Sequence, residues 1–145
     1  MNQYSTKQEP LTEMLMRHEG VRRNPYKCSA GVLTIGIGRN LESVGLSDDE
    51  IFYMLKNDIR RCDEELNNAF RWYEHLRQPR KDAMISLCFN LGINRLRGFK
   101  RALAAMEMDS YDEAASEFLD SKWATQVGQR AIELTDMIRT GEYDA

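Results

Sequence analysis

Apolar residues recur at helical spacing along most of the chain, and this pattern predicts most of its elements. The first stretch begins near Pro10 and ends at Glu19, where Gly20 provides a helix stop. A long helix is predicted over 47–68, because an apolar stripe follows the capping box formed by Ser47 and Glu50. Shorter helices are predicted to begin near Pro79, Phe99, Ser110 and Gly128. The spacing of Ser110 to Glu113 predicts a second capping box.

The segment between the first two helices has a different pattern. Val32 to Ile37 is apolar and β-branched, with glycines around it, which predicts a strand in a small hairpin sheet. Asn24-Pro25, just before it, predicts a non-helical turn. The expected fold is therefore α+β, with a small β-hairpin lobe and a larger helical lobe joined by a long helix. A cleft between the lobes would suit a long substrate.

Composition limits the functions that this architecture can serve. The 145 residues fit one domain, 1–145, whose residues 1–9 we expect to be flexible. The net charge of −3 argues against a nucleic-acid partner. No apolar run approaches the ~20 residues of a membrane span, and the first ten residues lack the pattern of a secretory signal. We therefore expect a cytoplasmic protein without stable membrane insertion.

The cysteines predict neither a disulfide scaffold nor a metal site. Cys28, Cys62 and Cys88 are an odd set without the paired spacing of zinc ligands. Cys62 and Cys88 fall on apolar helix stripes, so we interpret them as buried structural residues. No metal and no cofactor are expected.

Candidate chemistry is concentrated in the segment from Glu19 to Thr34. Eight residues lie between Glu19 and Cys28, and five between Cys28 and Thr34. A carboxyl at a helix end, a polar group on the next turn and a hydroxyl on the next strand can converge on one cleft. Such a set suits acid-assisted attack of water on an acetal carbon.

This spacing, followed by the strand TIGIG at 34–38, resembles the active-site signature of phage-type lysozymes, or endolysins. The resemblance runs from about Leu11 to Ala145. It includes the segments FNLG (89–92), GF (98–99), DEAA (112–115), SKW (121–123), QR (129–130) and RTG (139–141). It implies a muramidase that hydrolyses the β-1,4 bond between N-acetylmuramic acid and N-acetylglucosamine in bacterial peptidoglycan. Glu19 would be the general acid, and Cys28 and Thr34 would position or activate water, with net inversion.

Cys28 departs from the family pattern, in which many members have Asp. A thiol with a pKa of ~8.5 is mostly neutral near pH 7, unless Arg39 or Arg130 lowers that pKa. Three roles are open: the thiolate acts as a base, the group only orients water, or the thiolate attacks the sugar as a nucleophile.

The resemblance also assigns supporting residues. Phe89 and Asn90 would line the cleft, and the Asn90 amide can both donate to and accept from an N-acetyl group. Arg130 would pair with the catalytic glutamate. Arg39 and Asp58 would replace the His–Asp pair that many members place between strand and long helix, as a structural contact.

The implied biological role is host-cell lysis at the end of a phage infection. Without a signal, the enzyme would leave the host cytoplasm through a holin-type pore, and we expect it to be a monomer. One alternative is a lytic transglycosylase, which closes an anhydro ring without water. The other is a non-catalytic wall-binding module, which the replacement of Asp by Cys28 keeps open.

Overall fold

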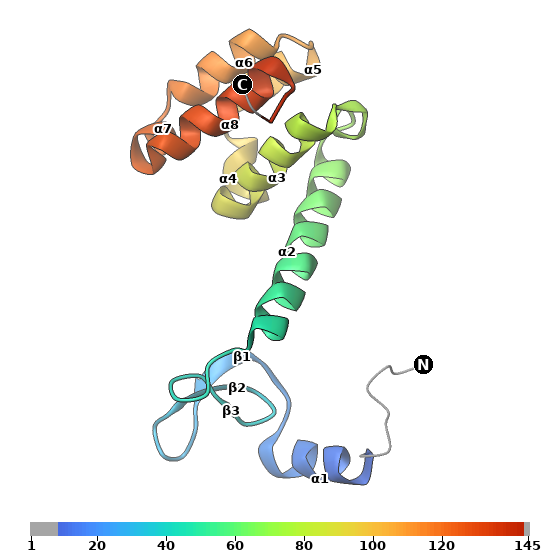
Figure 1. Cartoon of the computed structure of the whole chain (residues 1–145), viewed down its shortest axis with the longest axis vertical. Helices are drawn as coiled ribbons and strands as arrows, with labels where there is room; N and C mark the ends of the chain where they lie inside the picture. Colours follow the sequence, from blue (N-terminus) through green and yellow to red (C-terminus); the bar gives the residue numbers. More distant parts are fainter. Residues whose placement is uncertain (1–8, 144–145) are drawn as a thin grey trace. The chain divides into compact units, whose positions relative to one another are not determined.

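The computed structural model describes residues 9–143 and divides the chain into two compact units (Figure 1). Unit 1 extends to Phe52, and unit 2 begins at Tyr53. The segment 1–9, predicted to be flexible, lies outside the described residues except for Glu9, where the first helix begins. Eight α-helices and a small antiparallel sheet within the described residues confirm the predicted α+β class. No helix among residues 9–143 has both the length and the apolar character that crossing a membrane requires.

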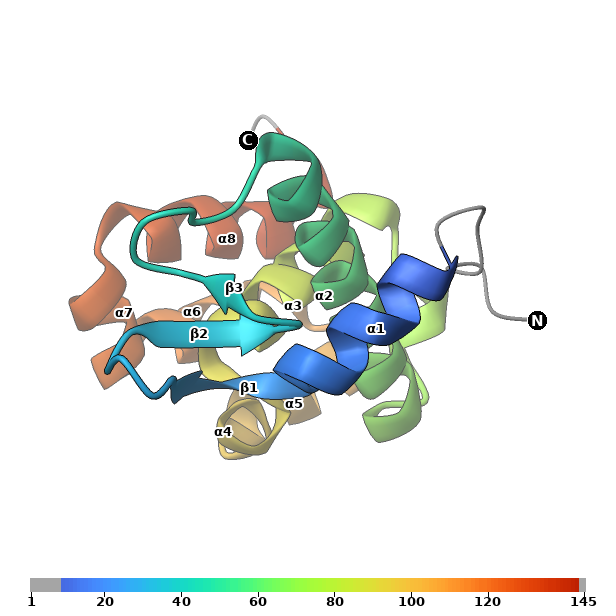
Figure 2. The ribbon, with the colours of Figure 1, turned by 90° about the horizontal axis from the view of Figure 1, so that it is seen from below.

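Unit 1 begins with a helix that leads into a three-stranded sheet (Figure 2). The elements are α1 (Glu9–Glu19), β1 (Arg22–Lys27), β2 (Leu33–Gly36) and β3 (Arg39–Asn40), and the strand order is β1-β2-β3. Helix α1 ends as predicted at Gly20, whose φ of 77° is in the left-handed region. The N–H of Gly20 donates to the carbonyl of Met16 at 2.9 Å and closes the last turn.

The turn predicted at Asn24-Pro25 is wrong, because both residues lie within β1. Arg22 is opposite Gly36, whereas Tyr26 is opposite Thr34, so β1 contains extra residues between these pairs. This irregularity is a β-bulge. Proline lacks a backbone N–H, and a bulge in an outer strand is a place where the sheet tolerates that loss.

Helix α2 (Asp48–Ala69) begins at the predicted capping box. The N–H of Ser47 donates to Oε1 of Glu50 at 2.8 Å, and the N–H of Glu50 donates to Oγ of Ser47 at 3.3 Å. These reciprocal bonds satisfy two backbone donors at the helix start.

The apolar stripe of α2 is buried at its C-terminal end only. Cys62 and Leu66 are 3% and 0% exposed, in agreement with the prediction. Ile51, Leu55 and Ile59 belong to the same stripe, for which the apolar pattern also predicts burial. All three are exposed, so this part of the prediction is wrong.

Unit 2 contains the rest of α2 and a set of shorter helices. These are a 3₁₀ turn (Tyr73–His75), α3 (Gln78–Leu91), α4 (Ile93–Arg97), α5 (Lys100–Glu107), α6 (Tyr111–Leu119), α7 (Lys122–Val127) and α8 (Gln129–Thr140). Pro79 lies in the first turn of α3, as predicted, where a missing N–H leaves no bond unmade.

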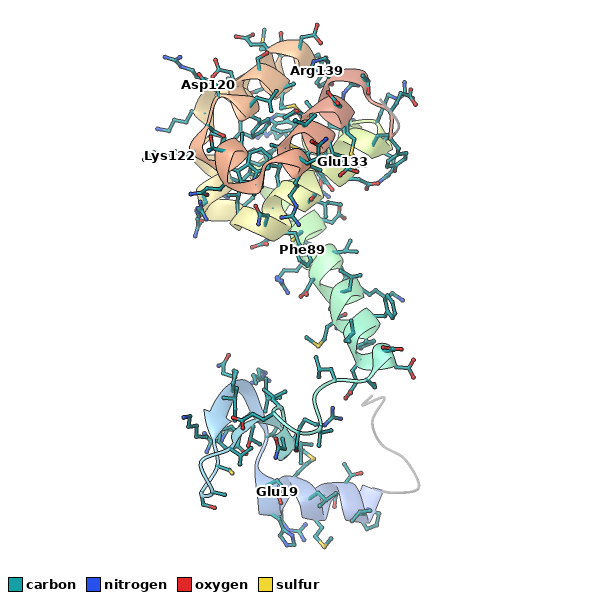
Figure 3. All side chains as sticks on the ribbon, turned by 60° about the vertical axis from the view of Figure 1, so that its left-hand side comes forward. Glu19, Phe89, Asp120, Lys122, Glu133 and Arg139 are labelled. Atoms are coloured by element: carbon teal, nitrogen blue, oxygen red, sulfur yellow. The ribbon has the colours of Figure 1, made fainter. Side chains whose placement is uncertain are left out.

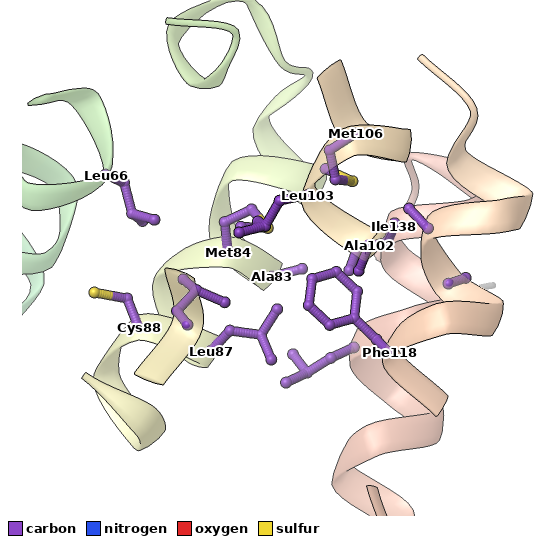
Figure 4. Packing of buried hydrophobic residues seen from close by; sticks show 14 of the residues in the cluster. Leu66, Ala83, Met84, Leu87, Cys88, Ala102, Leu103, Met106, Phe118 and Ile138 are labelled. Atoms are coloured by element: carbon purple, nitrogen blue, oxygen red, sulfur yellow. The ribbon is translucent and has the colours of Figure 1, made fainter. Parts of the chain in front are cut away.

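The apolar core of the described residues lies in unit 2 (Figure 4). Phe118 on α6 is completely buried and packs against Phe99, with ring centroids 5.4 Å apart. Met84 and Leu87 from α3 and Ile138 from α8 are also completely buried. The helices of unit 2 are therefore joined through a shared apolar interior.

The second predicted capping box is wrong. Ser110 precedes α6, but its side chain makes no capping hydrogen bond. Its N–H donates to the carbonyl of Ala105 at 2.8 Å, so the preceding turn determines its backbone conformation. Ser121 does cap a helix of unit 2: its Oγ accepts the N–H of Ala124 at 3.2 Å at the start of α7.

Candidate active site

The carboxylate of Glu19 lies against the glycine-rich end of the sheet. Figure 3 shows Glu19 at the C-terminal end of α1. A Cβ atom added to Gly38 would lie 2.7 Å from Oε2 of Glu19 and 2.9 Å from its Cδ, and Gly38 has a φ of 69°. Only glycine combines this backbone conformation with so close an approach. The last glycine of TIGIG therefore allows the carboxylate to approach this turn, and the Glu19 side chain remains exposed.

Cys28 and Thr34 lie together in the hairpin that joins β1 to β2. The N–H of Cys28 donates to the carbonyl of Val32 at 3.0 Å, and the N–H of Gly31 donates to the carbonyl of Cys28 at 2.8 Å. Thr34 is only 5% exposed, and its hydroxyl donates to the Val32 carbonyl at 2.8 Å. Cys28 is half-buried, and a side-chain hydrogen bond connects it to Thr34.

Backbone amides lower the pKa of the Cys28 thiol. The N–H of Val32 has the largest effect, that of Ala30 comes next, and the Thr34 hydroxyl adds to them, while burial acts in the opposite direction. The sequence left open whether Arg39 or Arg130 lowers this pKa. Arg39 is not among the causes, and the role of Arg130, which lies in the other unit, stays a prediction. Neutral donors in a tight turn therefore favour the thiolate here.

The Thr34 hydroxyl has a single proton, which it cannot donate to Val32 and to Cys28 at once. While it donates to the Val32 carbonyl, it offers only a lone pair to the S–H of Cys28. Donation to a thiolate would require the hydroxyl to rotate away from Val32. The state of Cys28 and the orientation of Thr34 are therefore coupled.

Arg39 has a different partner from the one predicted. Its guanidinium donates to both carboxylate oxygens of Glu50, at 2.8 and 2.6 Å, and to the carbonyl of Gly45 at 2.9 Å. Asp58, the predicted partner, instead accepts from Arg61 at 2.8 Å. Asp58 lies eight residues beyond Glu50 on α2, a rise of ~12 Å, so the first turn of the helix offers the nearer carboxylate.

Glu50 therefore has two functions, of which sequence analysis found one. It completes the capping box, and it forms a bidentate ion pair with Arg39. The Arg39 hydrogen bond lowers the pKa of Glu50 to about 2, with help from the backbone and side chain of Ser47.

Two of the predicted site residues in unit 2 share a hollow. Phe89, half-exposed on α3, and Arg130, exposed on α8, both line a depression of about 400 Å³. The other lining residues are Leu55, Ile59, Asp82, Ile85 and Ser86. Apolar walls with a few charged and hydroxyl groups suit a ligand with both apolar and polar faces.

Asn90 is exposed but does not line this hollow. Its Oδ1 accepts the indole N–H of Trp123 at 2.9 Å. Because indole nitrogen only donates, this bond fixes the orientation of the amide. Among the described residues the Asn90 amide nitrogen has no hydrogen bond, so it is available as a donor, and the Oδ1 atom keeps a second lone pair as an acceptor.

The residues predicted to be functional fall into two sets. Glu19, Cys28 and Thr34 are all in unit 1, on a helix end and the hairpin that follows it. Phe89, Asn90 and Arg130 are in unit 2. Sequence analysis missed the effect of the hairpin amides on Cys28, for which a sequence pattern carries no signal. It also missed Asp82 and Ser86 in the hollow, which lie about two turns and one turn before Phe89 on α3.

Within the described residues of unit 1, no three metal-ligating side chains lie close together. Within residues 9–143, the one group of three that lie close together is in unit 2 and consists of Cys62, Glu65 and Cys88.

A small sheet beside a helix-end carboxylate, together with a larger helical unit, defines a lysozyme-like α+β protein. The sequence profile of the family described as phage lysozyme matches residues 16–139, and the chain belongs to this family. Membership places it among lytic enzymes of the glycosidase type.

Three relatives illustrate the range of the family. A SAR-endolysin of Haemophilus phage HP1 is 36% identical over 101 residues, which cover 68% of this chain and about half (52%) of that relative. Probable T4-type lysozyme 1 of Dictyostelium discoideum is 27% identical over 165 aligned positions, covering 93% of this chain and 96% of the relative. The endolysin of Salmonella phage P22 is 29% identical over 113 residues, covering 72% and 75%.

Proposed function

We propose that this chain is a peptidoglycan muramidase that hydrolyses the β-1,4 bond between N-acetylmuramic acid and N-acetylglucosamine. The observation that carries the proposal is the close approach of Glu19 to Gly38, which holds a carboxyl group beside the strand that bears Thr34. In this mechanism Glu19 protonates the glycosidic oxygen as it leaves.

Cys28 and Thr34 act on the water that attacks the anomeric carbon. A thiolate favoured by the amides of Val32 and Ala30 accepts a proton from this water, and the Thr34 hydroxyl orients it. Attack from the face opposite the leaving group inverts the anomeric centre. If Cys28 instead attacked the sugar itself, two displacements would retain the configuration.

The residues of unit 2 contribute binding in this proposal. Phe89 offers an aromatic face to the sugar, and the free amide nitrogen of Asn90 donates to an N-acetyl carbonyl. Arg130 supports the catalytic glutamate. Because the family profile spans parts of both units, we infer that they serve one lysozyme-like enzyme.

The first test is the release of reducing ends from purified peptidoglycan by the wild type and by Glu19→Gln. General acid catalysis is worth ~10²–10⁴-fold, so the variant should lose activity on that scale while remaining folded. Glu13→Gln, a change at an exposed glutamate of the same helix, is the matched control and should keep wild-type activity. Equal loss in both variants would contradict a specific role for Glu19.

Cys28→Ser separates the possible roles of the thiol. Strong loss of activity supports a base, and activity close to wild type leaves Cys28 an orienting or spectator group. The anomer first released, followed by proton NMR, should be inverted, and a retained product would indicate a nucleophilic Cys28.

Two competing functions have distinct products. A lytic transglycosylase would release anhydromuramic ends, which mass spectrometry detects. A wall-binding module would bind peptidoglycan and release no reducing ends. This function stays an alternative because Cys28 stands where many family members have Asp. For the cell, we propose host lysis by a monomer that reaches the wall through a holin-type pore.

A further inference from the structure

Two cysteines and a glutamate meet inside unit 2. Cys62 and Glu65 are three residues apart on α2 and so lie on one face of that helix, and Cys88 lies on α3. Their sulfur and carboxylate atoms all lie within 4.8 Å of one another. The Sγ of Cys88 donates to Oε1 of Glu65 at 3.9 Å.

This group is largely enclosed by the core, to which Cys88 and Leu66 belong (Figure 4). Cys62 is 3% exposed and Cys88 is 2% exposed, while Glu65 is only half-buried. Burial raises the pKa of Cys62, and it raises that of Cys88 to about 12. Both sulfurs are therefore protonated in the absence of a compensating cation.

We propose that Cys62, Glu65 and Cys88 form a binding site for one thiophilic divalent cation of the zinc type, with water as the fourth ligand. A zinc ion with Zn–S bonds of ~2.3 Å holds two tetrahedral thiolates about 3.8 Å apart. The two sulfurs lie within 4.8 Å of each other, and the Cys88 Sγ and Glu65 Oε1 atoms are 3.9 Å apart. The site therefore needs only small side-chain movements to close around the ion.

The charges of the site suit a dication. Binding removes one proton from each thiol, which goes to solvent, and creates two thiolates beside the Glu65 carboxylate. The ion offsets two of these three negative charges. Arg61 supplies a further positive charge that acts on both cysteines, although it is itself paired with Asp58.

A disulfide between the same cysteines is the competing use of this pair. Its sulfurs would have to approach to ~2.05 Å, and a disulfide leaves Glu65 without a function at the site. Disulfide formation also begins with a thiolate, and burial opposes thiolate formation at both residues. A metal ion supplies the compensating charge itself, so the geometry favours the ion.

The experiment titrates the reduced, metal-free full-length protein with Co²⁺ and follows its absorption. One equivalent should produce a thiolate-to-cobalt charge-transfer band and the visible bands of tetrahedral cobalt, and one equivalent of Zn²⁺ should abolish both. Cys62→Ser and Cys88→Ser should lose the charge-transfer intensity. Cys28→Ser, which removes the third thiol, is the control and should keep it.

Glu65→Gln tests the carboxylate without altering the buried sulfurs. We expect its Co²⁺ affinity to fall at least about tenfold, whereas Glu64→Gln, an exposed neighbour on the same helix, should bind like the wild type. The proposal is overturned if the wild type gives no charge-transfer band, or if the band depends on Cys28. A disulfide would also overturn it. In that case the metal-free protein would lose two mass units in air through a Cys62–Cys88 bond, and folded, reduced Cys28→Ser protein would bind no Co²⁺.

Discussion

The two units of this chain hold their functional groups in place by different means. Unit 2 has an extended apolar core, whereas among the described residues of unit 1 only Thr34 is buried. Unit 1 depends on backbone pairing, a capping box and the Arg39–Glu50 ion pair. The comparison indicates that apolar packing stabilises one unit, while directional polar contacts position the candidate catalytic residues in the other.

The largest effect is expected in the core of unit 2. Phe118→Ala should lower the free energy of unfolding by about 3–5 kcal/mol, because it removes a completely buried ring and leaves a cavity. Phe52→Ala in unit 1 removes the same ring where it is 67% exposed and should change stability by ~0.5 kcal/mol or less. Urea denaturation measures both values. Similar losses would mean that unit 1 has an apolar interior of its own.

Gly38→Ala tests whether directional contacts govern unit 1. Alanine must adopt a φ of 69° and its Cβ must displace the Glu19 carboxylate, so activity should fall by about 10²-fold. Gly36→Ala is the matched control, since Gly36 has the same φ of 69° and nothing lies within 4 Å of an added Cβ. Both changes should cost ~1–2 kcal/mol of backbone strain. If both variants lost activity equally, strain and not the position of Glu19 would be responsible.

Cys28→Asp examines how the hairpin activates water. In the wild type, activity should rise with pH as Cys28 loses its proton, which gives the pH profile an ascending limb. Because the thiol pKa is lowered, this limb should lie at lower pH than for an ordinary cysteine. A carboxylate has an ordinary pKa of ~3.9, so the variant should move the limb to lower pH. The pH profile of kcat/KM gives the measurement. An unchanged limb in Cys28→Asp would show that another group is the base.

The smallest effect concerns the Arg39–Glu50 pair. The pKa of Glu50 is about 2 in the folded protein and ordinarily 4.5, so folding favours its charged form. The resulting stabilisation is fully present above the ordinary value and disappears as the pH falls toward 2. Glu50→Gln should therefore be less stable than the wild type near pH 7 and lose less stability on acidification. The effect is small because both side chains are about one-third exposed, at 34% and 38%.

A double-mutant cycle isolates this pair. Arg39→Gln should reproduce the altered acid sensitivity of Glu50→Gln, and the double variant should add little to either. Full additivity in thermal unfolding at several pH values would contradict a coupled pair.

Local features of this fold were predictable from sequence, and long-range partners were not. The bonds between Ser47 and Glu50 involve neighbours along the chain, so the pattern alone located them. The same pattern at Ser110 failed because the turn after α5 already determined its backbone. The capping-box pattern shows that a serine side chain can cap a helix, but the backbone conformation of the preceding turn determines whether the cap forms.

The candidate site shows the same limit. The spacing of Glu19, Cys28 and Thr34 identified the residues of the hairpin, but not the amides that act on the thiol. The family resemblance assigned Asp58 as the partner of Arg39, whereas Arg39 forms its ion pair with Glu50, at the start of the same helix. Cys62 and Cys88 come from two different helices, so no short spacing in the sequence predicts their contact.

The sheet of unit 1 also has consequences for self-association. Its outer strands expose backbone groups that could pair with a second molecule. On one side, β1 carries Pro25 at its bulge and the exposed cations Arg22, Arg23 and Lys27, and on the other side β3 is only two residues long. Neither edge offers a long, flat, apolar template for intermolecular β-pairing. Short edges, a proline and exposed cations are features that oppose edge-to-edge aggregation of a sheet.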